Sequence, residues 1–157
     1  MAEFDGLTEF VKSGQNRLRD AEKLLDAPTE AKFEQGANTR HLRGAMYLAG
    51  YGVECLLKAY IISKRRGCTR LSEVVAGLQA EGKDVRDICG HAGHDLAYLL
   101  TLTGLEARMP LSRREQMSIC AKWRSSWRYN PVSARREDAE ALVQASRSIV
   151  EWIKTQI

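Results

Sequence analysis

Apolar residues recur at spacings of three and four along most of the chain, and no stretch alternates apolar and polar positions as a half-buried strand does. This periodicity predicts helices. The first covers residues 6–26, and Pro28 ends it. Its inward face is expected to comprise Leu7, Val11, Gly14, Leu18, Ala21 and Leu25.

A second helix is predicted to begin near Thr39 and to run to the Arg65-Arg66-Gly67 exit. Apolar residues cover most of its circumference in two neighbouring stripes: Leu42, Met46, Ala49, Val53, Leu56 and Tyr60, and Leu48, Gly52, Cys55, Ala59 and Ile62. A helix that is apolar on so many sides belongs at the centre of a bundle.

A third stripe of this helix is polar or amphipathic and consists of Tyr47, Tyr51, Glu54 and Lys58. Glu54 and Lys58 stand four residues apart, which is the spacing of an ion pair within one helix. The alternative is that the stripe faces a groove and contributes to a binding site. On its residues alone the stripe fits both interpretations.

The remaining pattern predicts shorter helices over Leu71–Ala80 and over residues 95–103, with Leu96, Leu99 and Leu100 inward. Ser112-Arg-Arg-Glu115 matches a capping box, which predicts a helix over residues 112–125 with Ile119, Cys120 and Trp123 buried. Arg128-Tyr-Asn-Pro131 interrupts the pattern. A last helix follows over residues 134–154, with an inward face of Ala139, Leu142, Val143, Ser146, Ile149, Val150 and Ile153.

These elements predict an all-α fold, an up-and-down four-helix bundle with one or two additional short helices. We find no repeat and no linker, so residues 1–157 are expected to form a single domain. No apolar run comes close to the roughly 18 residues of a membrane span, and the N-terminus carries acids rather than a leader-like apolar stretch. We therefore expect a cytoplasmic protein that has no contact with a membrane.

The net charge of +4 is small, but it is unevenly distributed. Residues 39–70 and residues 112–136 each carry seven basic residues and one acidic residue, whereas the segments around them are acidic. If the two basic segments pack side by side, they form a face suited to phosphate. An ordinary solvated surface is the alternative.

The segment Trp123-Arg-Ser-Ser-Trp127-Arg-Tyr-Asn-Pro131 combines two arginines with three aromatic residues. Arg124 and Arg128 can bind phosphate, and an aromatic ring can stack on a base. In the alternative interpretation, the tryptophans belong to the core and the arginines stack on them only for packing.

Cys89, His91 and His94 place one thiol and two imidazoles within six residues, and zinc accepts such ligands. A structural zinc site needs a fourth ligand, which would have to be Asp95 or a distant cysteine, Cys68 or Cys120. We therefore expect no metal, and a loop in which His94 or Asp95 caps the next helix. The sequence has no phosphate-binding glycine loop, HExxH or GxSxG pattern, and we expect no cofactor.

Three segments together resemble the HEPN family (higher eukaryotes and prokaryotes nucleotide-binding): YLAGYGVECLLKAYII at 47–62, HDLAYLL at 94–100 and WRYNP at 127–131. The resemblance covers about residues 5–155 and is closest to a stand-alone prokaryotic member. It implies a helical bundle that forms a homodimer and handles nucleotides or RNA. It also implies a toxin–antitoxin or defence-type setting, in which a minimal nucleotidyltransferase serves as the antitoxin.

Many members of this family are metal-independent RNases whose site uses an arginine and a histidine four to six residues apart. The resemblance assigns the arginine to Arg128, but Ser133, Ala134 and Arg135 occupy the histidine positions. Arg86 and His91 have the right spacing and precede a different helix. The catalytic candidates are Arg128, His91 and His94, because an imidazole moves protons near neutral pH and a guanidinium stabilises phosphorane charge.

The leading hypothesis is a nucleotide- or RNA-binding module that lacks the complete Arg/His motif. Its candidate binding residues are Arg124, Arg128, Tyr129, Asn130, Arg135, Tyr51, Glu54 and Lys58. One alternative is a metal-independent RNase toxin with a non-standard active site. The other is a structural dimerisation scaffold for a nucleotidyltransferase partner.

Overall fold

The computed structural model describes residues 5–27, 37–129 and 134–157, and these are helical with no strand among them. Six α-helices occur: α1 (Leu7–Asp26), α2 (Ala37–Ser63), α3 (Leu71–Ala80), α4 (Leu96–Thr103), α5 (Leu111–Cys120) and α6 (Arg136–Lys154). Three short 3₁₀ helices join them: η1 (His91–His94), η2 (Leu105–Arg108) and η3 (Ser125–Tyr129). The predicted all-α fold is confirmed.

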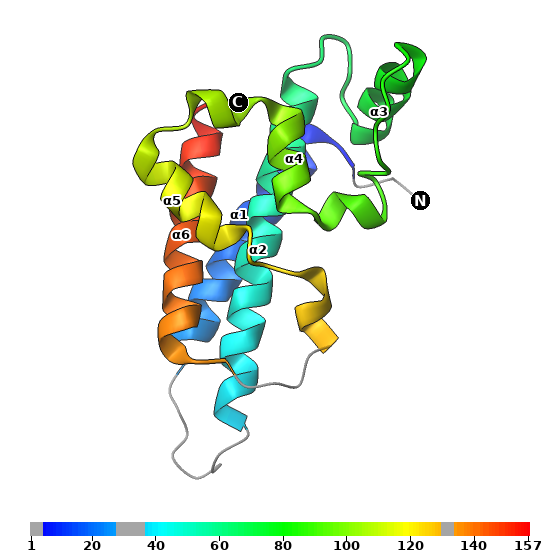
Figure 1. Ribbon diagram of the computed structural model, residues 1–157. Helices are drawn as coiled ribbons and strands as arrows, with labels where there is room; N and C mark the ends of the chain where they lie inside the picture. Colours follow the sequence, from blue (N-terminus) through cyan, green and yellow to red (C-terminus); the bar gives the residue numbers. More distant parts are fainter. Residues whose placement is uncertain (1–4, 28–36, 130–133) are drawn as a thin grey trace.

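The three long helices α1, α2 and α6 pack along one another and form the body of the bundle (Figure 1). The short helix α5 packs on α6, and α4 packs on α2. The bundle is therefore built on three long helices, with two short helices beside them where the sequence pattern predicted a fourth main helix. Helix α3 lies at one end of the molecule (Figure 1).

Helix α2 is the central helix, as its apolar circumference predicts. Ala45, Ala49, Val53, Leu56 and Ala59 are all completely buried. Small residues allow α1 to approach closely: a Cβ added at Gly14 would lie 3.0 Å from the Gly52 carbonyl oxygen, and one at Gly52 would lie 3.1 Å from the Gly14 oxygen. The two backbones cross at these glycines, where any side chain would separate them.

By length and composition, residues His41–Ser63 of α2 could also cross a membrane, with a mean hydropathy of 1.2. However, 83% of this window is buried inside the bundle. The core helix of a bundle passes the same test, because it too is apolar on most sides.

Several helix ends differ from the predicted ones. Helix α5 begins at Leu111 after Pro110, so Ser112 lies in the first turn and is not the cap. The helix also ends at Cys120 rather than at residue 125, where a tight turn joins the Trp123 amide to the Cys120 carbonyl at 2.9 Å. Helix α6 begins at Arg136, two residues later than predicted.

The start of the described chain is joined to the start of α3. The Leu71 amide donates to the Asp5 carbonyl at 2.9 Å, and the Ser72 hydroxyl donates to Asp5 Oδ2 at 2.7 Å. The Ser72 amide also points to Asp5 Oδ2, at 3.3 Å. Asp5 thus accepts from the first turn of α3 as a capping residue does, although 67 residues separate it from Ser72.

Candidate functional site

A buried ion pair lies on the polar stripe of α2. Lys58 Nζ is 2.8 Å from Glu54 Oε1, and the two side chains are only 7% and 2% exposed. The ion pair proposed from the spacing is therefore confirmed. Lys58 Nζ also lies 5.9 Å from the centre of the Phe10 ring of α1. Neither charged group lines an open groove, since both are enclosed by the bundle.

The second oxygen of Glu54 binds His94. Glu54 Oε2 is 2.9 Å from His94 Nδ1, and the imidazole side chain is 34% exposed. A carboxylate oxygen accepts hydrogen bonds, so in this contact Glu54 is the acceptor of a hydrogen bond from Nδ1. This bond uses Nδ1 and leaves Nε2 as the ring nitrogen at which a proton can be gained or lost. A buried carboxylate that orients a partly exposed imidazole is a common arrangement for proton transfer.

The turn before α4 brings His94 to this carboxylate. A Cβ added at Gly93 would clash with the Ile88 carbonyl oxygen and would lie 2.8 Å from Lys58 Nζ, so only glycine fits. Asp95 then caps α4 by accepting from the Tyr98 amide at 3.0 Å, which confirms the predicted cap. The hydrogen bond from Tyr98 holds the pKa of Asp95 below its ordinary value, and Arg86 at 3.1 Å adds to the effect.

Aromatic rings adjoin His94. Trp123 is 1% exposed, and its ring meets the imidazole edge-on at 6.5 Å between centres. Its Nε1 donates to the Tyr47 carbonyl at 3.1 Å, and a Cβ added at Gly50 would clash with its indole. Tyr47 stacks in parallel on Tyr51 at 6.3 Å. Trp123 is thus a core residue that fixes the end of α5 against α2.

The two basic segments meet where η3 packs on α2. The Arg43 guanidinium lies over the Trp127 ring, 5.1 Å from its centre. Tyr129 at the end of η3 is 75% exposed. Arg124 is exposed and donates to the Ala121 and Trp123 carbonyls, both at 2.7 Å, at the end of α5. We use the name α2–η3 face for Tyr47, His94, Arg124 and Tyr129, which are partly or fully exposed and lie on α2, on η3 or on the turns next to them.

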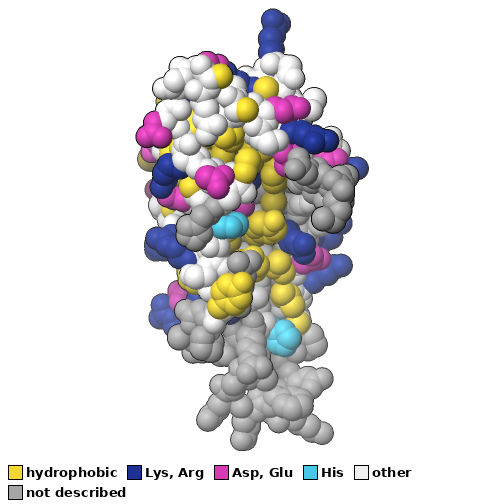
Figure 2. Space-filling view, turned by 90° about the vertical axis from the view of Figure 1, so that its right-hand side faces the viewer, with side chains coloured by type: hydrophobic (Ala, Val, Ile, Leu, Met, Phe, Trp, Pro, Cys, Tyr) yellow, Lys and Arg dark blue, Asp and Glu magenta, His cyan; other side chains and the backbone are white. Residues whose placement is uncertain are grey.

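Figure 2 views the molecule from the side on which α4 and η3 lie in Figure 1. Hydrophobic side chains run down the middle of this side and histidine side chains lie among them, while lysines and arginines lie toward both edges with acidic side chains between them (Figure 2). Apolar and aromatic groups flanked by cations are suited to bases and phosphates together.

The other predicted site residues either lie away from Glu54 and His94 or fall outside the residues that the structure describes. Arg135 is 79% exposed and pairs with Asp138 at 3.0 Å, with no described contact to Glu54 or His94. Arg86, which has the spacing of the family's arginine relative to His91, is stacked on Tyr98, with its guanidinium carbon 3.7 Å from the ring centre. Asn130 lies outside the described residues, as do the side chains of Arg128 and His91.

No group of three His, Cys, Asp or Glu side chains that could hold a metal occurs in the described part of the chain. His94 in particular has its Nδ1 committed to Glu54. Burial raises the pKa of Cys55 to about 12, helped by the charge of Glu54, and burial raises the pKa of Cys120 to about 11. Both thiols are therefore protonated at neutral pH and are poor nucleophiles.

Sequence reasoning placed Glu54 and His94 in separate candidate sets and missed that they bind each other. The one available signal was that both lie in segments rich in candidate residues. Comparisons of the chain with family models, with curated proteins and with solved structures find no match.

Proposed function

We propose that this protein binds a nucleotide or single-stranded RNA on the α2–η3 face. The observation that supports this best is the pair of bonds made by Glu54, which hold the partly exposed His94 against the buried Trp123 ring, and that ring in turn adjoins Tyr47. An oriented imidazole can bind a phosphate oxygen, and exposed Tyr129 offers a ring for stacking. Arg124, which is exposed and bonded to the Trp123 carbonyl, adds a cation near the end of α5.

Fluorescence anisotropy with a labelled single-stranded RNA tests this proposal. His94→Ala and Tyr129→Ala are expected to weaken binding, the latter by about 1–3 kcal/mol if a base stacks on the ring. Arg124→Ala should weaken binding to all sequences alike. It should also reduce the slope of the logarithm of the binding constant against the logarithm of the salt concentration by about one. The matched control is Arg108→Ala, because Arg108 is an equally exposed arginine on η2.

Equal affinity of the wild type and the three variants would contradict the proposal, as would failure to bind either RNA or any of the common nucleotides. Arg128→Ala belongs in the same series because the HEPN resemblance assigns that residue to the site. If only Arg128 matters, the binding surface includes η3 but not His94, Arg124 or Tyr129.

A second candidate function is metal-independent cleavage of RNA, and the Glu54–His94 bond is the observation that favours it. In this scheme, the Nε2 atom of His94 removes the proton of a 2′-hydroxyl, and the 2′-oxygen attacks the adjacent phosphorus to form a 2′,3′-cyclic phosphate. The displaced 5′-oxygen of the next nucleotide takes up a proton from water. Glu54 holds the ring and stabilises its positive charge.

Incubation with mixed RNA in EDTA separates cleavage from binding. An RNase of this kind would lose about 10²- to 10⁴-fold of its rate in His94→Ala, since that variant lacks the base. Intact RNA after long incubation with the wild type would remove the cleavage function and leave binding in place. The structural scaffold predicted as an alternative would show neither binding nor cleavage.

The HEPN resemblance also implies two protein partners, which we include in this proposal: a second copy of the chain and a minimal nucleotidyltransferase. Sedimentation of the purified protein tests the homodimer directly. A monomer at all concentrations would contradict that part of the proposal without affecting nucleotide binding by one chain.

A further inference from the structure

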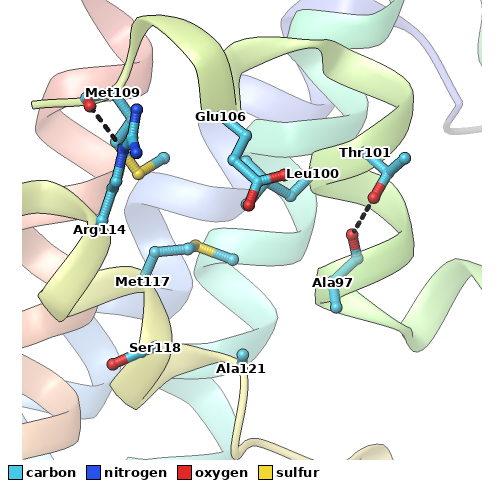
Figure 3. A pocket seen from close by; sticks show the side chains of 9 residues that line it. All are labelled: Ala97, Leu100, Thr101, Glu106, Met109, Arg114, Met117, Ser118 and Ala121. Carbon is cyan, nitrogen blue, oxygen red and sulfur yellow. Dashed lines mark hydrogen bonds between the residues drawn. The ribbon is translucent and has the colours of Figure 1, made fainter.

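A cavity separate from the α2–η3 face lies between α4, η2 and α5, with a volume of about 290 Å³ (Figure 3). Its apolar wall is formed by Leu100, Met109 and Met117, which are 9%, 4% and 4% exposed. Two of these three are methionines, whose unbranched thioether side chains adapt to ligands of different shape. None of the residues that line the cavity belongs to the α2–η3 face.

Two opposite charges stand at this cavity and do not pair with each other. Glu106 points from η2 into the space between α4 and α5, and Arg114 extends from α5 on the other side, beside Met109 (Figure 3). Glu106 is exposed, and its carboxylate makes no hydrogen bond or ion pair with any described residue. The Nε of Arg114 donates to the Met109 carbonyl at 3.0 Å, which fixes the side chain and leaves its terminal nitrogens available.

The ligand that satisfies this arrangement carries a cation, an anion and a compact apolar group. An ammonium would bind Glu106, a carboxylate would bind the fork of Arg114, and the apolar group would cover the two methionines. The volume is at the lower end for small-molecule sites, which excludes a ligand as large as a dinucleotide.

We infer that this cavity binds a free α-amino acid with an apolar side chain, such as leucine, methionine or phenylalanine. These molecules hold the ammonium and the carboxylate on one carbon atom and the apolar group on the next. The site is independent of nucleotide or RNA binding, because it uses different residues on different elements.

Methyl NMR of the protein labelled at its methionine methyl groups tests the inference. L-Leucine is expected to shift the signals of Met109 and Met117 in a saturable way. Met46 serves as the internal reference, since it packs in a separate cluster with Leu42 and Leu142. Met109→Leu and Met117→Leu assign the two signals.

Two analogues and two variants identify the charged contacts. L-Leucinamide lacks the carboxylate and N-acetyl-L-leucine lacks the ammonium, so each should bind about fivefold more weakly than L-leucine, as expected for the loss of one solvent-exposed ion pair. Glu106→Gln should weaken L-leucine and leave N-acetyl-L-leucine unchanged. Arg114→Gln should weaken L-leucine and leave L-leucinamide unchanged.

Control variants are Arg108→Gln on η2 and Glu115→Gln on α5, which are exposed and do not line the cavity. Shifts of Met109 and Met117 that follow this pattern support the inference. It is overturned if L-leucine leaves both signals in place, or if both analogues bind as well as L-leucine does. The analogue series uses the wild-type protein, so it stands even if a variant folds poorly.

Discussion

Glu54 Oε2 and His94 Nδ1 lie 2.9 Å apart, although 40 residues separate the two in the chain. The carboxylate also holds the ammonium of Lys58 on its other oxygen, so one buried group satisfies two partners. Glu54 therefore links the central helix to the turn that begins α4, and its removal affects both the stability of the bundle and the orientation of the imidazole.

Replacement of Glu54 is expected to destabilise the protein strongly. Glu54→Ala leaves Lys58 buried without a counter-ion, which costs about 3–5 kcal/mol of unfolding free energy. Urea denaturation followed by circular dichroism measures this change. Glu151→Ala on the exposed side of α6 is the control and should change the unfolding free energy by less than about 0.5 kcal/mol. Similar effects of the two substitutions would contradict the buried ion pair.

Two glycine-to-alanine substitutions are expected to have opposite effects. Gly50→Ala inserts a methyl group into the indole of Trp123 and should destabilise the protein by about 1–3 kcal/mol. At Gly77 in α3, an added Cβ meets nothing within 4 Å, so Gly77→Ala should stabilise the protein by about 0.4–1 kcal/mol. Thermal unfolding of both variants measures these changes. Equal melting temperatures would show that the indole is not packed against α2.

The four cysteines are expected to react in two groups. Cys89 is exposed and Cys68 is half-buried, whereas Cys55 and Cys120 are buried and have raised pKa values. A chromogenic disulfide reagent at pH 8 should therefore modify Cys89 and Cys68 in the folded protein, and the other two only after unfolding. Peptide mapping by mass spectrometry identifies the sites. Fast modification of Cys120 in the folded state would contradict its burial.

The Asp95 cap predicts a loss of stability in acid. The pKa of this carboxyl is lower in the folded state than its ordinary value of 3.8, first because it accepts from the Tyr98 amide and then because of Arg86. A lowered pKa means that the stabilisation is fully present above pH 3.8 and is lost as the pH falls through the folded value. Because Asp95 is 45% exposed, the contribution is small.

Urea denaturation between pH 6 and pH 2 tests the cap. Asp95→Ala should cost about 1 kcal/mol at pH 6, as loss of a helix cap usually does. The difference between the variant and the wild type should shrink below pH 3.8, because the wild-type carboxyl is then protonated as well. A difference that is constant over the whole range would show that the ionised carboxylate is not what caps α4.

Periodicity predicted the long helices well because burial repeats with the helix. All seven residues assigned to the inner face of α6 are buried, from Ala139 to Ile153. Trp123 and Cys120 are buried as predicted, whereas Ile119 is only partly buried. The end of α5 was predicted wrongly because tertiary contacts determine it: Trp123 leaves the helix to bond the Tyr47 carbonyl and to fill the space at Gly50.

The candidate site could be predicted only in part. Spacing along one helix identifies Glu54 with Lys58, since residues four apart are neighbours. It gives no information on His94, whose approach to Glu54 depends on how the turn at Gly93 packs against α2. The charge distribution left open whether residues 39–70 and 112–136 pack side by side, and the contact of Arg43 with Trp127 brings residues of the two segments together.

The hydrogen bonds between Asp5 and the start of α3 have a consequence for the order of folding. A helix of ten residues is too short to persist alone in water. Since its first turn is satisfied by Asp5, which lies two residues before α1, α3 should acquire its structure only after α1 has docked on α2. In hydrogen exchange, amides of α3 should then open before those of α2.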